Sequence, residues 1–202
     1  MRRIVRMAAI LAAAVPALAT AASSTWTVDP AHAEAGFAVK HLVISTVRGD
    51  FNKLGGTVVL DEGDVTKSTV EVTIDAASID TRIEKRDTHL KSADFFDVAK
   101  YPNITFKSAK VEKSGEGKLK VTGNLTIKAT TKPVVLEVTG PTGEIKGPDG
   151  KGRRGFSATT KINRQEFGLT WSKTVEAGPV VGDEIAIQID GELIKADQPA
   201  AK

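Results

Sequence analysis

The residues best suited to metal chemistry in this chain are its three histidines, because the sequence has no cysteine. A structural zinc site needs four close ligands, and the recurrent motifs bring histidine and cysteine together at short, regular spacings. His32, His41 and His89 are too widely scattered along the chain for such a motif. We therefore predict no metal site, and no other feature of the sequence points to a cofactor.

Nucleophilic catalysis is the second chemistry to consider, since Ser92 lies close in sequence to His89 and Asp94. Serine hydrolases hold the nucleophile on a strained turn, often within the signature G-x-S-x-G. That signature is absent, and helical spacing alone often produces such a trio. A pair of glycosidase carboxylates cannot be singled out among the 25 acidic residues. The sequence therefore predicts no catalytic residue and favours a protein that is not an enzyme.

Binding of an apolar ligand is the chemistry that the remaining residues could support. Phe37, Val39 and His41 share one face of a predicted strand, so His41 is expected to point inward near an opening. His41 could hydrogen-bond a ligand headgroup or a backbone carbonyl, and we favour the structural role. Phe95 and Phe96 are adjacent and should point in opposite directions on an extended segment, so one could fill the core while the other lines a tunnel.

A further aromatic pair, Phe167 and Trp171, shares its parity with Leu169 and is followed by the basic Lys173. These side chains could pack against an edge of the sheet, which is the reading we favour. They could instead form an aromatic rim over the polar end of a ligand.

Strands are the elements that must position these residues, because the dominant period of the chain is two. Apolar and polar residues alternate, as is typical of strands with one buried and one solvated face. The longer alternating runs are residues 70–74, 119–127, 134–138 and 185–189, and the shorter ones are residues 37–39, 58–60, 104–106 and 156–158.

Turn signals separate these runs, at Gly55-Gly56 and at residues 61–64, 114–117 and 147–152. One charged, glycine-free segment, residues 82–90, is predicted to be helical. Many strands with so few helices predict an antiparallel all-β fold, since parallel sheets need crossover helices. A sheet of about eight strands can close into a barrel whose interior is either filled by side chains or hollow enough for one ligand.

The first 21 residues are typical of a secretory signal peptide. Arg2, Arg3 and Arg6 precede an apolar run, and Ala19-Thr20-Ala21 fits the cleavage pattern. The run is shorter than the roughly 20 apolar residues that span a bilayer. We therefore expect a signal peptide (1–21), one domain (22–195) and a flexible tail (196–202). The expected product is an exported, periplasmic protein with no stable membrane insertion.

Removal of the signal peptide would also remove the excess positive charge. The formal net charge of +3 equals the contribution of those three arginines, so the mature chain is formally neutral. A neutral chain gives no reason to expect a nucleic-acid partner. Without cysteine, an exported domain must be stabilised by its core rather than by disulfides.

Several motifs, in order along nearly the whole mature chain, resemble those of the YceI-like family, exported lipocalin-like proteins that bind polyisoprenoids. The most specific block is R-D-T-H-L-K-S-A-D-F-F-D at residues 86–97, with Y-P-N-I-T-F-K-S at residues 101–108 behind it. The others are W-T-V-D-P-A-H (26–32), F-A-V-K-H-L (37–42), V-R-G-D-F (47–51), S-I-D-T (78–81), G-N-L-T-I (123–127), T-K-P-V (131–134) and R-Q-E-F-G-L (164–169). The chain departs from the family pattern at Ala33, where serine is usual, and at Lys128-Ala129, where His-Gly is common.

The resemblance implies an eight-stranded antiparallel, lipocalin-like barrel with a hydrophobic tunnel, capped by a short helical segment at residues 86–96. It implies a long apolar ligand, such as a polyprenyl chain or an isoprenoid quinone, and a homodimer is one assembly it could form. On that fold, the expected ligand contacts are Phe37, Val39, His41, Phe51, Val72, Ile74, Phe95, Phe96, Phe106, Leu125, Val134, Leu136, Phe156, Phe167 and Trp171.

Three functions remain open at this point. The first, which we favour, is a periplasmic carrier for such a lipid, because a dry tunnel recovers about 0.8 kcal/mol for each methylene removed from water. The second is an enzyme acting on such lipids, which would lose activity but not binding on substitution of His89 or His41. The third is a solid-core stress or adhesion module, from which organic extraction would release no lipid.

Overall fold

The computed structural model describes residues 23–175 and 178–197 of the chain. The expected signal peptide and residues 198–202 of the expected tail lie outside this part. Ala196, at the start of that tail, donates its backbone N–H to the carbonyl of Thr25, 2.8 Å away. The strands are β1 (Ser23–His41), β2 (Ser45–Phe51), β3 (Leu54–Asp61), β4 (Thr69–Asp75), β5 (Ile79–Asp80), β6 (Asn103–Gly115), β7 (Lys118–Ile127), β8 (Thr130–Thr139), β9 (Ile145–Lys146), β10 (Gly152–Asn163), β11 (Thr174–Val175), β12 (Gly178–Pro179) and β13 (Val181–Lys195), and the helices are α1 (Glu84–Lys91) and the short 3₁₀ turns η1 (Val65–Lys67), η2 (Ala76–Ser78) and η3 (Arg164–Phe167).

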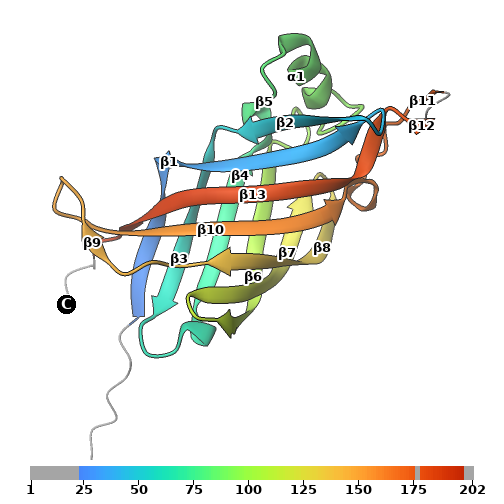
Figure 1. Ribbon diagram of the computed structural model, residues 1–202. Coiled ribbons are helices and arrows are strands. Elements are labelled where there is room, and N and C mark those ends of the chain that lie inside the picture. The colour runs from blue at the N-terminus through green and yellow to red at the C-terminus, as the bar shows by residue number, and fades with distance from the viewer. Residues whose placement is uncertain (1–22, 176–177, 198–202) are drawn as a thin grey trace, which may run out of the picture.

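Eight of these strands form a closed antiparallel barrel. The pairing runs in the order β1, β3, β4, β6, β7, β8, β10, β13, and β13 pairs again with β1 (Figure 1). Closure leaves the barrel without a free edge. The predicted all-β, eight-stranded barrel with one short helix in the described part of the chain is therefore confirmed.

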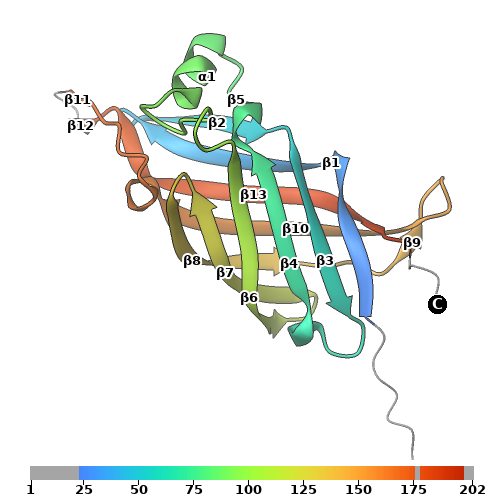
Figure 2. The same cartoon turned by 180° about the vertical axis from the view of Figure 1, so that it is seen from behind.

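The strand β1 can serve two neighbours on one side because it is long and irregular. Its first half pairs with β3 and its second half with β2, while β13 lies along the other side. The register with β13 shifts between Val28 and Ala33, around Pro30. Proline has no N–H to donate to a ladder, so it is tolerated at such an irregularity. Figure 2 shows the first half of β1 turned away from the second.

The alternation of apolar and polar residues along each strand determines which side chains point into the barrel. On β4, Val72 and Ile74 are partly buried inside, whereas Glu71 and Thr73 are exposed. Val72 lies opposite Phe106 of β6, which is buried in the same core. Because period two fixes the face of each residue, the barrel interior could be assigned from the sequence for most strands.

The prediction of a turn at Gly55-Gly56 is wrong, since both residues lie within β3. A Cβ on Gly56 would lie 2.5 Å from the carbonyl oxygen of Glu71 and 3.1 Å from the Cα of Val72 on β4. Glycine is therefore present because two strands approach closely there. The connection between β2 and β3 is instead made by residues 52–53.

The helix α1 lies at one end of the barrel (Figure 1) and begins after a sharp backbone turn. Arg82 has a φ of 66° and donates its N–H to Oδ1 of Asp80, so the helix begins after it rather than at the predicted residue 82. Asp87 accepts hydrogen bonds from the backbone and hydroxyl of Thr81, and Arg86 donates to the same residue. These contacts anchor the helix to the sheet. None of the helices in the described part is long and apolar enough to cross a membrane.

Candidate functional site

An apolar cavity of about 240 Å³ occupies the interior of the barrel. Side chains from all eight barrel strands line it, together with residues of the segment around α1. Within the described residues, the only lining side chains with polar atoms are those of Ser68, Thr105, Thr160 and Arg164. The interior is therefore hollow over this volume and offers mainly apolar surface to a molecule inside it.

Most of the residues expected to contact a ligand lie on this lining. Several residues that were not singled out from the sequence line it too, including Leu54, Val121 and Ile187, and strand parity could have identified them. The expected residues on the lining are Phe37, Val39, Phe51, Val72, Ile74, Phe95, Phe96, Phe106, Leu125, Val134, Leu136 and Phe156. Their contact with a ligand stays a prediction.

Aromatic rings gather in the cavity near the helical segment. The Phe51 ring lies 5.9 Å from that of Phe37 and 5.6 Å from that of Phe96, which it meets edge to face. Both Phe95 and Phe96 line the cavity, although they are adjacent. The segment is a series of hydrogen-bonded turns, in which Phe96 donates to the carbonyl of Leu90, so the opposite orientation expected of an extended segment does not apply.

Three expected contact residues lie outside the cavity lining. Phe167 is 2% exposed and belongs to the packed core at η3, where the chain turns and strand parity has no meaning. Trp171 packs against Phe95, with ring centres 5.2 Å apart, and so backs the lining from outside. His41 ends β1, and its carbonyl accepts hydrogen bonds from the Ile44 backbone and the Ser45 hydroxyl.

Arg164 is the one charged residue among the described residues that line the cavity, and its structural importance was not predicted from the sequence. It is 2% exposed, and its guanidinium donates to the carbonyls of Leu169, Trp171, Val181 and Gly182 and to the carboxylate of Asp183. All five of its N–H donors are thereby used. The side chain therefore ties Leu169 and Trp171 to the start of β13 at residues 181–183 and has no donor left for a ligand.

The candidate hydrolytic trio has the wrong geometry in this structure. The Ser92 hydroxyl donates to the backbone carbonyl of His89, 2.7 Å away, rather than to the imidazole. The ring nitrogen Nε2 of His89 lies 2.9 Å from Oδ2 of Asp94. A nucleophile must lie within hydrogen-bond reach of its base, and here the hydroxyl is used to end the helix.

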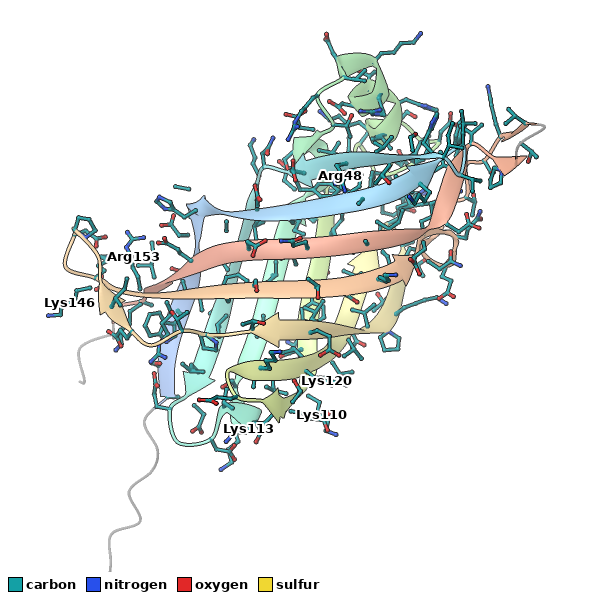
Figure 3. All side chains as sticks on the ribbon, viewed as in Figure 1. Arg48, Lys110, Lys113, Lys120, Lys146 and Arg153 are labelled. Atoms are coloured by element: carbon teal, nitrogen blue, oxygen red, sulfur yellow. The ribbon has the colours of Figure 1, made fainter. Side chains whose placement is uncertain are left out.

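Among the described residues, one group of potential metal ligands comes together, at the irregularity of β1 between Val28 and Ala33. Single ligand atoms of Asp29, His32 and Glu192 lie within 4.8 Å of one another. Arg153, labelled in Figure 3, donates to Asp29 at 2.8 Å and to Glu192 at 3.1 Å. The guanidinium therefore already supplies the positive charge that these carboxylates need, and the group is an ion-pair cluster that joins β1, β10 and β13.

This cluster makes stability depend on pH. Hydrogen bonds from His32, from the backbone N–H of Ala31 and from Arg153 lower the pKa of Asp29 from 3.8 to about 2. Because the pKa of Asp29 is lower in the folded than in the unfolded state, its charged carboxylate stabilises the fold at pH values above about 4. That stability is lost as the pH falls from about 4 towards 2. We expect a contribution of about 2 kcal/mol at neutral pH.

The expected result is that Asp29→Asn lowers the melting temperature at pH 6 and flattens its dependence on pH between 4 and 2. Thermal unfolding followed by circular dichroism across this range measures it. Glu116→Gln, at an exposed hairpin carboxylate, is the matched control and should leave the wild-type profile unchanged. Equal profiles for Asp29→Asn and wild type would show that the cluster does not stabilise the barrel.

A closed antiparallel barrel around an apolar cavity defines a lipocalin-like architecture, and comparison with known proteins agrees. The YceI-like domain model matches residues 26–193. The chain is 40% identical over 161 residues to Protein YceI of Salmonella newport, covering 79% of this chain and 81% of that protein. It is 38% identical over 165 residues to a UPF0312 protein of Vibrio cholerae, covering 82% and 86%. The chain belongs to the YceI-like family.

Solved structures share the fold. The YCEI protein of Campylobacter jejuni has a TM-score of 0.67 and 37% identity, covering 78% of this chain and 90% of that one. BcnA of Burkholderia cenocepacia has a TM-score of 0.70 and 26% identity, covering 84% and 99%. A polyisoprenoid binding domain from Saccharophagus degradans has a TM-score of 0.59 and 12% identity, covering 86% and 99%, a likeness of fold alone.

Proposed function

We propose that this protein is a periplasmic carrier that holds one long-chain isoprenoid or similar amphiphilic lipid inside its barrel. The observation that carries the proposal is the cavity of about 240 Å³ with its almost wholly apolar lining. Such a lining offers few hydrogen-bond partners to a polar substrate. Each methylene moved into it from water contributes about 0.8 kcal/mol to the free energy of binding. The signal-peptide features of residues 1–21 support export.

The lining also bears on selectivity. Few polar side chains reach the cavity, and the most strongly polar of them, Arg164, is already saturated by carbonyls and Asp183. Selection by headgroup needs polar groups that lose their partner when the wrong ligand binds. Polyprenols and isoprenoid quinones are therefore both accepted as ligands in this proposal. A carrier or store fits this loose selection better than a discriminating receptor or an enzyme, and we assign no catalytic residue.

The experiment is a titration of delipidated protein with prenols of increasing length, followed by tryptophan fluorescence. Affinity should rise by at least about tenfold for each added isoprene unit until the cavity is full, and then level off. Replacing the terminal hydroxyl by a quinone ring should change affinity much less than removing one unit. Affinity that is independent of chain length would contradict the proposal.

A further inference from the structure

Three exposed apolar side chains gather at one end of the barrel. Ile44 is 83% exposed and Val43 is 60% exposed, both in the turn between β1 and β2. Val175, on the neighbouring hairpin of β11 and β12, is 45% exposed. We call these three side chains the apolar tip. Burial inside the protein does not account for any of them, since each has much of its surface in water.

The two turns that carry the tip are joined to each other. The N–H of Leu42 donates to the carbonyl of Val180 at 3.0 Å, and a Cβ on Gly178 would lie 3.6 Å from Cγ2 of Val43. Figures 1 and 2 both show the β1–β2 turn beside β11 and β12, projecting from the barrel. The apolar tip is therefore one convex feature rather than scattered surface residues.

The backbone of the tip is unfavourable for the residues it carries. Leu42 and Val43 have φ values of 50° and 65°, in the left-handed region. Glycine or asparagine adopts this region readily, whereas a β-branched residue such as valine rarely does. An exposed valine in a strained conformation lowers stability without a gain in packing, which is typical of residues retained for function.

The charges around the tip suit an anionic surface. Lys40 and Lys173 are exposed and flank it, and the Lys40 ammonium donates to the Thr46 hydroxyl rather than to a carboxylate within residues 23–175 and 178–197. Of the nearby acidic residues in the described part of the chain, Asp183 binds Arg164 and Glu184 lies 2.8 Å from Lys161, whereas Glu176, next to Val175 in the sequence, lies outside that part. Positive charge is thus available beside the apolar side chains.

The cavity reaches the foot of the tip. Val39 and Val181 both line it, and Val181 pairs with His41, the last residue before the β1–β2 turn.

A second protein copy would need about 20–30 residues on each side for a stable interface. Three side chains on two narrow turns cannot provide that, but they are sufficient to insert into the headgroup region of a bilayer.

We propose that the apolar tip inserts reversibly into an anionic lipid bilayer and brings the end of the cavity against the membrane. Insertion of a few apolar side chains with adjacent lysines gives weak, salt-sensitive binding of the kind that permits release. The docking itself follows from the surface of the protein. The transfer of an apolar chain between bilayer and cavity rests on the proposed carrier function.

The test is sedimentation of the mature protein with vesicles of phosphatidylethanolamine and phosphatidylglycerol, with phosphatidylcholine vesicles for comparison. The double substitution Val43→Asn and Ile44→Asn should weaken binding to the anionic vesicles by at least about tenfold. It should not lower the melting temperature, because asparagine suits the left-handed backbone at position 43 and Ile44 is 83% exposed. The control is Ile145→Asn on β9, where the isoleucine is 67% exposed away from the tip, and it should bind like wild type.

Two further experiments test the role of the lysines and separate membrane docking from lipid uptake. Lys40→Glu with Lys173→Glu should abolish the preference for anionic vesicles. Uptake of geranylgeraniol from detergent solution should be unchanged in the tip variant, while its extraction from vesicles is slowed. Vesicle binding that is equal in wild type and tip variant would overturn the docking proposal, as would a tip variant that only converts a dimer to a monomer. Wild type that docks but takes up no prenol would instead overturn the carrier function and leave the docking intact.

Discussion

Replacing Val72 with tryptophan is expected to reduce geranylgeraniol binding by at least about tenfold while the ligand-free barrel unfolds at about the wild-type urea concentration. Val72 lines the cavity from β4, opposite Phe106 and next to the closely approaching Gly56. A larger side chain there can extend into empty volume, so it competes with the ligand for space without overpacking a filled core.

The control for this substitution is its neighbour. Thr73 lies on the same strand but is exposed, so Thr73→Trp should leave both binding and stability close to wild type. If the interior were filled, Val72→Trp would instead overpack it at a cost of about 1–3 kcal/mol. A strongly destabilised Val72→Trp variant would therefore contradict the hollow interior, and retained binding would contradict the assignment of the cavity as the binding site.

Substitution of Arg164 by leucine is expected to have the largest effect on stability, a loss of at least about 3 kcal/mol in the free energy of unfolding. The leucine would remove the donor from the carbonyls of Leu169, Trp171, Val181 and Gly182 and release Asp183. Arg164→Lys should recover only part of the loss, because an ammonium cannot reproduce the planar fork of a guanidinium. Urea unfolding followed by fluorescence measures both variants.

Arg48 provides the matched control, since it is exposed on β2 (Figure 3). Arg48→Leu should change the free energy of unfolding by no more than about 0.5 kcal/mol. Comparable stabilities for the Arg164→Leu and Arg48→Leu variants would show that the buried guanidinium does not stabilise the packing of Leu169 and Trp171 against the start of β13.

The barrel could be predicted from the sequence because its determinant is local. Alternation along residues 70–74 and 119–127 places valine, leucine and isoleucine on one face, and period two leaves little freedom in which face that is. The same parity put Val72, Leu125 and Leu136 inside. Parity is informative only in extended chain, which is why it could not decide between edge packing and ligand contact for Phe167 and Trp171, whose segment begins with the 3₁₀ turn η3.

The features that could not be predicted depend on residues distant in sequence. Arg153 and Asp29 are 124 positions apart in the sequence. No local pattern predicts that β1 and β10 place the Arg153 guanidinium 2.8 Å from the Asp29 carboxylate. Gly56 is needed because of the β4 backbone, not because of its own strand. Whether the barrel is hollow depends on the balance between enclosed volume and side-chain volume over all eight strands, which no single motif encodes.

The central claim is that the interior of this barrel holds a long apolar molecule. It is tested most directly by native mass spectrometry of the protein recovered gently from the cells that produce it, followed by organic extraction and identification of the released lipid. We predict a mass above that of the polypeptide, removed by extraction and accounted for by an isoprenoid or similar amphiphile. A protein that has the mass of the polypeptide alone, and that gains no mass on incubation with geranylgeraniol, would contradict the account.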